Sequence, residues 1–216
     1  MPLRLRPLLL AACTLWPAMA GAHPHIFVDT GLTFVTDDAG RLTGVEVLWS
    51  YDELYSLLIL EDMSLDADYD GVLTEAEQAQ LQGFDMQWME GYAGDLYLSV
   101  DGTPVKLGPP QPLSTRMDGP HIETRHFRPL AEGPLALNGA ALTAKAYDPT
   151  FYTAYDLTRP LSAGAGCAVA VTKVDLDAAT AQMNAALDGR PAETDDFPEV
   201  GEAFADTIRL TCAEAS

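Results

Sequence analysis

Basic side chains are scarce in this chain of 216 residues, where 12 Lys and Arg stand against 32 Asp and Glu, giving a formal net charge of −20. A protein this negative repels nucleic acid and anionic membrane surfaces, which argues against both as partners and favours cations. Long apolar runs are also missing beyond the N-terminal region, so no later segment is expected to span a bilayer. Hydrophobic residues nevertheless make up 48% of the chain, which is enough for a packed core and excludes general disorder.

Cysteines and catalytic motifs are equally scarce. The chain holds three cysteines and contains no G-x-S-x-G, H-E-x-x-H or P-loop pattern. Hydrolysis and nucleotide-dependent chemistry therefore have no recognisable basis in the sequence. We predict a protein that is not an enzyme.

The first 22 residues (1–22) have the pattern of a cleaved secretory signal. A short basic start precedes an apolar run too short to cross a bilayer, and an A-x-A cleavage site ends at Ala22. Cleavage there would leave a periplasmic chain with a charge of −22, because two arginines are removed. A lipoprotein signal ending at Cys13 is the alternative, although an apolar, Pro-containing tail would then follow the cysteine where a polar tether is usual.

Two cysteines remain after such cleavage, Cys167 and Cys212. An even pair in an exported protein predicts a disulfide, which here would clasp a C-terminal segment. Two separate buried thiols are the alternative, and an oxidising compartment disfavours it. A cysteine-based metal site would need more nearby ligands than the sequence offers.

The hydrophobic pattern predicts strands interrupted by a pair of helices. Residues 25–36 and 42–50 are rich in Val, Ile, Phe and Thr and flank a D-D-A-G turn, which indicates a hairpin. Apolar residues at helical spacing then predict helices at 51–65 and 74–90, the second with a weak point at Gly83.

Strands resume after this helical region, and one late helix follows them. The expected strands are residues 96–100, 105–107, 121–130, 135–147, 167–174 and 207–212, with a loop at 108–112. A late helix is expected at 176–187, between an Asp start and an Asp-Gly stop. The predicted fold class is α+β: one β-rich, sandwich-like domain (23–216) with an EF-hand-like helix-loop-helix inserted at 51–90.

The most specific motif lies between the two inserted helices. Residues 66–77 match the calcium-loop pattern D-x-[DN]-x-[DN]-G-x₅-E at every required position. Asp66, Asp68 and Asp70 offer hard oxygen ligands, and Glu77 would close the shell with two further oxygens. Because Ca²⁺ prefers six to eight oxygens at flexible geometry, the spacing predicts a calcium site.

The other positions of this loop fit the same chemistry. Gly71 permits the sharp turn, Val72 would supply its backbone carbonyl, and Thr74 would coordinate directly or through a water. The alternative is a solvated acidic turn, with Thr74 and Glu77 acting only as a capping box. Since the chain holds a single loop of this kind and extracytoplasmic calcium is roughly millimolar, we expect a structural ion rather than a sensor.

Four histidines form a second candidate site. His23, which would become the N-terminal residue, and His25 could chelate Zn²⁺, Ni²⁺ or Cu²⁺, which prefer nitrogen ligands. Strand alternation places His121 and Glu123 on one face, where they could complete that site, and His126 on the other. Ordinary surface or capping roles are the alternative for each histidine.

These features together resemble a domain-of-unknown-function family known as the ABC-type uncharacterized transport system periplasmic component. The residues that carry the resemblance are H-P-H at 23–25, V-L-W-S-Y-D-E at 47–53, the loop at 66–77 and Y-D-P-T-F-Y at 147–152. Its members are associated with nickel, cobalt or zinc permeases. The resemblance implies that His23 and His25 are metal ligands and that an inner-membrane metal permease is the partner.

We therefore expect a non-enzymatic periplasmic metal-binding accessory protein of a transition-metal transport system, carrying a structural calcium loop. Two other hypotheses stay open. One is a calcium-stabilised adaptor or scaffold that uses the helix-loop-helix as its interaction surface and has no transition-metal role. The other is a copper enzyme that uses an N-terminal histidine.

Overall fold

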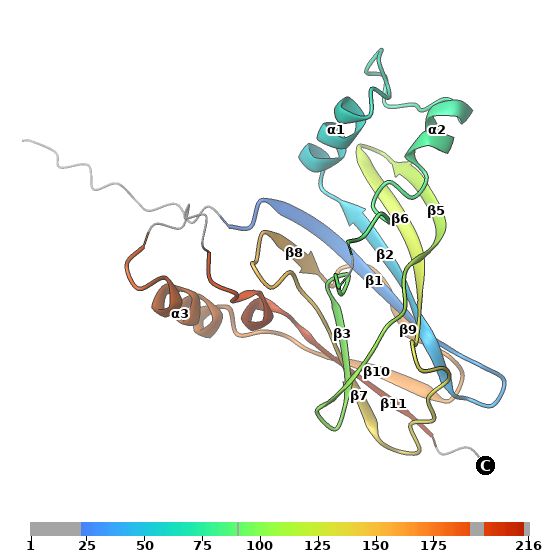
Figure 1. Cartoon of the computed structure of the whole chain (residues 1–216), viewed down its shortest axis with the longest axis vertical. Coiled ribbons are helices and arrows are strands. Elements are labelled where there is room, and N and C mark those ends of the chain that lie inside the picture. Colours follow the sequence, from blue (N-terminus) through green and yellow to red (C-terminus); the bar gives the residue numbers. More distant parts are fainter. Residues whose placement is uncertain (1–22, 90, 191–196, 214–216) are drawn as a thin grey trace, which may run out of the picture.

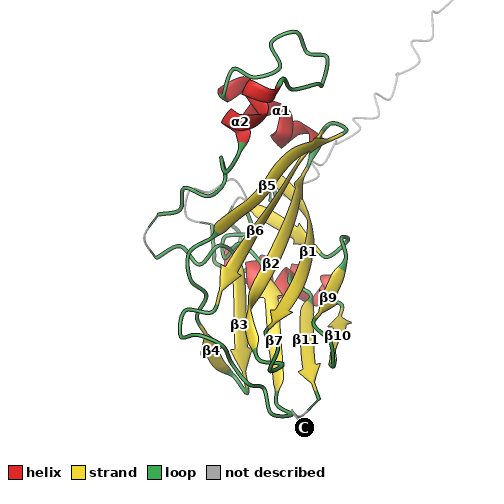
Figure 2. Cartoon of the chain, turned by 90° about the vertical axis from the view of Figure 1, so that its right-hand side faces the viewer, coloured by secondary structure: helices red, strands yellow, loops and turns green. Residues whose placement is uncertain are grey.

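The computed structural model describes residues 23–89, 91–190 and 197–213, and the expected export signal at 1–22 lies outside them. Two β-sheets make up most of the molecule, and a pair of helices projects from one end (Figures 1 and 2). This confirms the predicted α+β, β-rich class. Within the described ranges, no helix combines the length and the apolar character needed to cross a membrane.

The first sheet is built around the N-terminal hairpin. Its strand order is β5-β6-β2-β1-β8, and β9 also pairs with β1. Strands β8 and β9 run parallel to β1, and the other neighbours are antiparallel. The bounds are β1 Ile26–Thr36, β2 Leu42–Tyr51, β5 Gln111–Asp118, β6 His121–Pro129, β8 Thr153–Asp156 and β9 Leu161–Ala163.

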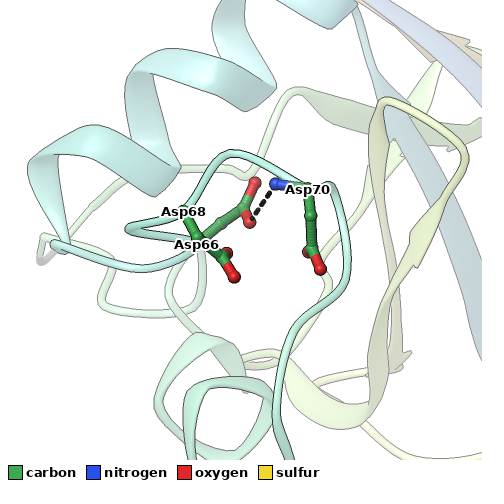
Figure 3. A group of neighbouring side chains, drawn as sticks. All are labelled: Asp66, Asp68 and Asp70. Carbon is green, nitrogen blue, oxygen red and sulfur yellow. Dashed lines mark hydrogen bonds between the residues drawn. The ribbon is translucent and has the colours of Figure 1, made fainter.

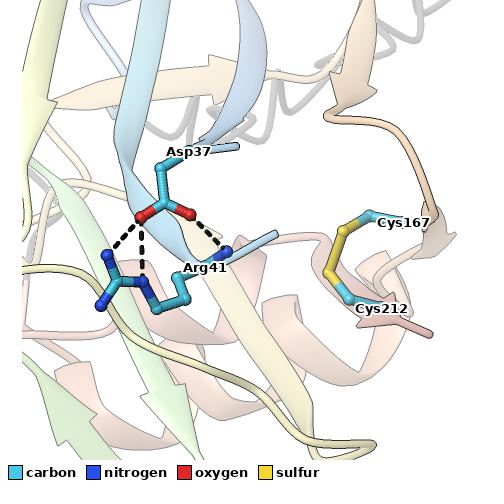
Figure 4. The surroundings of a disulfide bond; sticks show 4 residues. All are labelled: Asp37, Arg41, Cys167 and Cys212. Carbon is cyan, nitrogen blue, oxygen red and sulfur yellow. Dashed lines mark hydrogen bonds and ion pairs between the residues drawn. A yellow bond between two sulfur atoms is a disulfide. The ribbon is translucent and has the colours of Figure 1, made fainter. Parts of the chain in front are cut away.

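The turn between β1 and β2 forms where the sequence predicts it. The Asp37 carboxylate accepts hydrogen bonds from the backbone N–H groups of Ala39 and Arg41, at 3.0 and 2.9 Å, and pairs with the Arg41 guanidinium at 2.7 Å (Figure 4). These contacts with Arg41 lower the pKa of Asp37. The turn is thus closed by its own side chains, as is common for Asp in tight turns.

The second sheet has the order β10-β11-β7-β3-β4. Its strands are β3 Leu96–Val100, β4 Thr103–Val105, β7 Ala141–Ala146, β10 Cys167–Thr172 and β11 Thr207–Cys212. The predicted disulfide is present: Cys167 and Cys212 lie directly opposite each other on β10 and β11 and are bonded (Figure 4).

The two sheets share one hydrophobic core. Buried side chains of β1, such as Phe34, belong to the same cluster as Leu142 of β7 and Leu210 of β11. All three are fully enclosed, with exposed fractions of 0%. Packing of inward-facing residues from two sheets is what the alternating pattern of a sandwich predicts.

The helical pair lies between β2 and β3 and consists of α1 Glu53–Asp62 and α2 Glu75–Leu81. Asp52 caps α1, since its side chain accepts a hydrogen bond from the Tyr55 N–H at 2.9 Å. Leu60 and Leu81 join the main core, which anchors the helical pair to the sheets. Much of α1 faces solvent, and its exposed leucines are 54, 57 and 58.

The helix α3 Leu176–Leu187 matches the predicted range at both ends. Its N-cap Asp175 accepts a hydrogen bond from the Ala178 N–H, and Asp188 adopts the left-handed conformation that terminates helices. A short 3₁₀ helix, η1 Gly201–Phe204, packs near α3.

Several predicted boundaries are wrong. The second helix ends at Leu81 rather than at 90, because Gln82 leaves the helical conformation and Gly83 takes a positive φ of 72°. The strand predicted at 105–107 is found at Thr103–Val105, and the one predicted at 135–147 shortens to Ala141–Ala146. Three strands were not predicted: β5, β8 and β9.

Candidate functional site

The loop between α1 and α2 curls around its first aspartate. Both carboxylate oxygens of Asp66 accept hydrogen bonds from the Gly71 N–H, at 3.3 and 3.2 Å, and Oδ1 also accepts from the Asp70 N–H at 3.1 Å (Figure 3). Gly71 has a φ of 75°, a conformation that favours glycine. The curl brings ligand atoms of Asp66, Asp68 and Asp70 within 4.8 Å of one another.

Glu77 joins the two ends of this loop. Its Oε1 accepts from the Asp66 N–H at 3.1 Å, and its Oε2 accepts from the Thr74 N–H at 2.8 Å and the Thr74 hydroxyl at 2.7 Å. The Thr74 side chain in turn caps α2, which completes a capping box. Hydrogen bonds from Thr74, followed by the one from Asp66, lower the pKa of Glu77 and favour its charged form.

The last predicted ligand, Val72, is exposed on the loop, and its N–H donates to Asp70 Oδ1 at 2.8 Å. Below the loop, Leu65 and Leu73 belong to or pack against the main core. Contacts of Leu65 and Leu73 with the core therefore fix the position of the turn that carries the acidic residues. Oxygen ligands in this arrangement are suited to a hard cation such as Ca²⁺.

His23 and His25 lie next to each other at the start of β1. Their ring centroids are 4.9 Å apart, and the His23 ring stacks on Phe197 at 3.9 Å with an interplanar angle of 5°. His25 packs against Tyr152, with ring centroids 4.7 Å apart, and its backbone N–H donates to the Tyr152 carbonyl at 2.8 Å. Aromatic neighbours thus hold the two imidazoles as a pair.

The predicted ligands on β6 have other contacts. His121 Nδ1 lies 2.8 Å from the Tyr51 carbonyl oxygen. Glu123 is only 3% exposed and accepts from Arg116 Nη2 at 2.8 Å, with Arg125 Nε at 3.7 Å. The carboxylate of Glu123 is therefore neutralised by two arginines.

His126 is completely buried in the core. Its ring lies between Trp49 and Trp88, at centroid distances of 4.7 and 5.7 Å, and neither ring nitrogen has a hydrogen-bond partner among the described residues. Burial, with a smaller contribution from the positive charge of Arg128, lowers the pKa of His126 to about 3. The imidazole is therefore neutral at physiological pH.

The structure thus brings together some of the predicted site residues and separates others. Across residues 23–89, 91–190 and 197–213, the one group of three or more His, Cys, Asp or Glu side chains that converges is Asp66, Asp68 and Asp70. The rings of His23 and His25 lie next to each other. The three predicted ligands on β6 instead contact residues of β2 and β5: His121 contacts Tyr51, Glu123 contacts Arg116 and His126 contacts Trp49.

A cavity of about 590 Å³ was not foreseen from the sequence. It lies between the segment that follows α2 and residues of both sheets, and acidic and aromatic side chains dominate its lining. The acidic lining residues are Asp85, Asp95, Asp148 and Glu199. The available signal was the alternation of acidic and aromatic residues over 84–95, a stretch that helical spacing partly assigned to a helix.

Comparison with known proteins gives a family without an activity. The family model described as "Protein of unknown function (DUF1007)" matches residues 8–212. A search of curated proteins finds no match.

Proposed function

This chain belongs to DUF1007, a family of unknown function, and from its own residues we propose that it is an exported, non-enzymatic metal-binding accessory protein of a transition-metal transport system. Residues 66–77 hold a structural Ca²⁺ ion. His23 and His25 bind Zn²⁺, Ni²⁺ or Cu²⁺ and exchange it with an inner-membrane metal permease in the periplasm.

The convergence of three carboxylates in one closed loop carries the calcium part of this proposal. Asp66, Asp68 and Asp70 place ligand atoms within 4.8 Å of one another, so their negative charges repel unless a cation lies between them. Gly71 and Glu77 already hold the loop in its curl through hydrogen bonds to and from Asp66. A divalent cation would therefore meet oxygen ligands that need little rearrangement.

The transition-metal part of the proposal depends on the histidine pair. Two imidazoles with ring centroids 4.9 Å apart are close enough for a modest side-chain rotation to aim both at one ion. If the signal is removed after Ala22, the free α-amine of His23 adds a third nitrogen. The disulfide between Cys167 and Cys212 is consistent with the oxidising compartment in which such a site would act.

Calorimetric titration of the chelator-treated protein with CaCl₂ tests the calcium site. The double variant Asp66→Ala/Glu77→Gln is expected to lose the binding heat and the calcium-induced rise in melting temperature. Glu75→Gln is the matched control, because it removes a carboxylate from the first turn of α2 at a position that is not predicted to coordinate. Equal heats for wild type and the double variant would refute the assignment.

Metal analysis of protein purified from the periplasm tests the second site. After mass spectrometry has fixed the mature N-terminus, stoichiometric zinc, nickel or copper is expected in the wild type and is expected to be lost in His23→Ala and His25→Ala. His121→Gln, on β6, which β2 separates from β1 in the same sheet, shows whether the site extends beyond the pair. Absence of all three metals from the wild type after incubation with each would overturn this part of the proposal.

One observation favours the adaptor hypothesis as a second candidate. Leu54, Leu57 and Leu58 are 64%, 42% and 51% exposed on α1, which lies on the projecting helical pair (Figure 1). Exposed leucines at helical spacing are typical of partner-binding surfaces. A protein that binds calcium but no transition metal, and whose complex with the permease is lost on Leu54→Ser/Leu58→Ser substitution, would support this candidate instead.

A further inference from the structure

The acidic, aromatic cavity near the end of β2 has the properties of a ligand site. Its volume of about 590 Å³ lies within the usual range for small-molecule sites, roughly 300–1,000 Å³. Trp49 and Tyr51 of β2, Tyr97 of β3 and Tyr155 of β8 line it, so both sheets contribute. Every charged residue of the described lining is acidic, which selects for a positively charged occupant.

Asp95 is the most enclosed of these acids. It is 5% exposed, and its Oδ2 accepts hydrogen bonds from the hydroxyls of Tyr92 at 2.7 Å and Tyr155 at 2.8 Å. Its Oδ1 is buried and has no hydrogen-bond partner in the described part of the chain. Buried carboxylates are normally paired with a cation or fully hydrogen-bonded, so this oxygen lacks a partner that a ligand can provide.

Asp85 repeats the arrangement on the same segment. Its Oδ2 accepts from the Tyr51 hydroxyl at 2.8 Å and the Thr124 hydroxyl at 2.7 Å, while its Oδ1 is buried without a partner within the described residues. Neither Asp85 nor Asp95 forms an ion pair with a described Lys, Arg or His. Glu123, which is 3% exposed and so about as buried as Asp95, is by contrast paired with arginine.

Aromatic rings supply the second recognition element. Seven aromatic side chains line the cavity, including Trp88, one face of which is already stacked against the Arg128 guanidinium at 4.5 Å. Organic ammonium ions are recognised by such combinations of carboxylate and aromatic faces. Alkyl groups of the ligand would replace water against the rings.

A bare metal ion fits the cavity less well. Neither Asp85 nor Asp95 belongs to a group of three converging metal-ligating residues in the described ranges. Burial raises the pKa of Tyr92 and of Tyr155, so both phenols keep their protons and act as donors to Asp95 rather than as anionic ligands. The donor set therefore suits an N–H or N–CH₃ cation better than a coordination shell.

We propose that this cavity binds a small organic cation carrying an ammonium group, with Asp95 and Asp85 as its acceptors and Trp88 among the rings that face it. Asp148 and Glu199 add negative charge to the lining and strengthen the attraction without direct contact being required. The proposal is independent of the calcium loop and of the histidine pair.

Isothermal titration and tryptophan fluorescence test this site, since Trp49 and Trp88 both line the cavity. The probes are putrescine, choline, the neutral choline isostere 3,3-dimethylbutan-1-ol, and ZnCl₂ alone. Saturable binding of at least one ammonium probe is expected, with the neutral isostere at least about tenfold weaker, because a charge-assisted contact is lost.

Substitutions locate the binding. Asp95→Asn and Asp85→Asn are each expected to weaken the ammonium probe about tenfold or more, while Asp101→Asn, which removes the same charge at the exposed β3–β4 turn, leaves the affinity unchanged. Circular dichroism establishes that each variant is folded. Binding of neither ammonium probe, with or without binding of zinc, would overturn the proposal. So would choline binding no tighter than its neutral isostere where choline binds, or unchanged affinity of the bound ammonium probe in both cavity variants.

Discussion

Replacing His126 with leucine is expected to change how the stability of the protein depends on pH. Burial lowers the pKa of this histidine from 6.5 to about 3, so the folded state keeps it neutral where the unfolded chain takes up a proton. The stability that depends on the neutral ring is present above pH 6.5 and is lost as the pH falls toward 3. The loss is about 1.4 kcal/mol per pH unit, or about 3 kcal/mol between pH 6.5 and 4.

Asp95 contributes to the pH dependence of stability with the opposite sign, over nearly the same range of pH. Burial raises its pKa from 3.8 to about 6, so the folded state holds a proton that the unfolded state has released. Its contribution is present below pH 3.8 and is lost as the pH rises through 6, an effect of about 3 kcal/mol. In the wild type, the contributions of His126 and Asp95 should therefore largely cancel between pH 4 and 6.

Each single substitution removes one of these two contributions to the free energy of unfolding and leaves the other. Relative to wild type, His126→Leu should gain stability toward acid, and Asp95→Asn should lose it. Urea unfolding followed by circular dichroism at half-unit steps from pH 4 to 7.5, at constant calcium, measures both. Taking the difference between variant and wild type at each pH cancels the contributions of unrelated groups. A His126→Leu curve that runs parallel to the wild type over this range would refute the reasoning.

Three further predictions concern the stability of the folded protein. Reducing the disulfide, or replacing Cys167 and Cys212 with serine, should cost up to about 4 kcal/mol of unfolding free energy for a bond that spans 45 residues, measured by denaturant unfolding with and without reductant. Gly94→Ala should lower the free energy of unfolding by about 2 kcal/mol or more, since the φ of Gly94 is 68° and an added Cβ would lie 2.4 Å from the Trp88 ring. The control Gly102→Ala, with a φ of 78° but open space around it, should lower it by only about 1 kcal/mol in the same assay. Millimolar calcium should raise the melting temperature by a few degrees relative to EGTA, as a dissociation constant near 10⁻⁴ M implies about 1.4 kcal/mol, and no shift in a thermal scan would contradict the calcium assignment.

Local signals in the sequence predicted local structure well. The late helix has its predicted ends because Asp175 supplies the cap and Asp188 with Gly189 supplies the stop, all within one segment. The loop at 66–77 curls as its motif indicates, since Asp66, Gly71 and Glu77 find their partners within twelve residues. The disulfide followed from counting the cysteines that remain after the predicted export signal is removed.

Features that depend on residues far apart in the chain could not be predicted from the sequence alone. Strand β5 follows a Pro-rich stretch and forms only because β6 pairs with it, and the short strands β8 and β9 exist as neighbours of β1. The sequence placed His126 opposite His121 on β6, but its burial depends on Trp88, which comes from the irregular segment after α2. That segment also supplies Asp85 and Asp95, so the cavity appears only once the chain is folded.

The position of β1 also has a consequence for the order in which the sheet can be assembled. One edge of β1 pairs at once with β2, but the other edge waits for β8 and β9, which begin more than a hundred residues after β1 ends. At about 5–20 residues per second, synthesis leaves that edge without its partner strands for roughly 5–20 s. During this interval the hairpin offers open backbone groups to any other extended chain. We therefore expect the nascent protein to require a holding factor, or to stay unfolded until its C-terminal half is present.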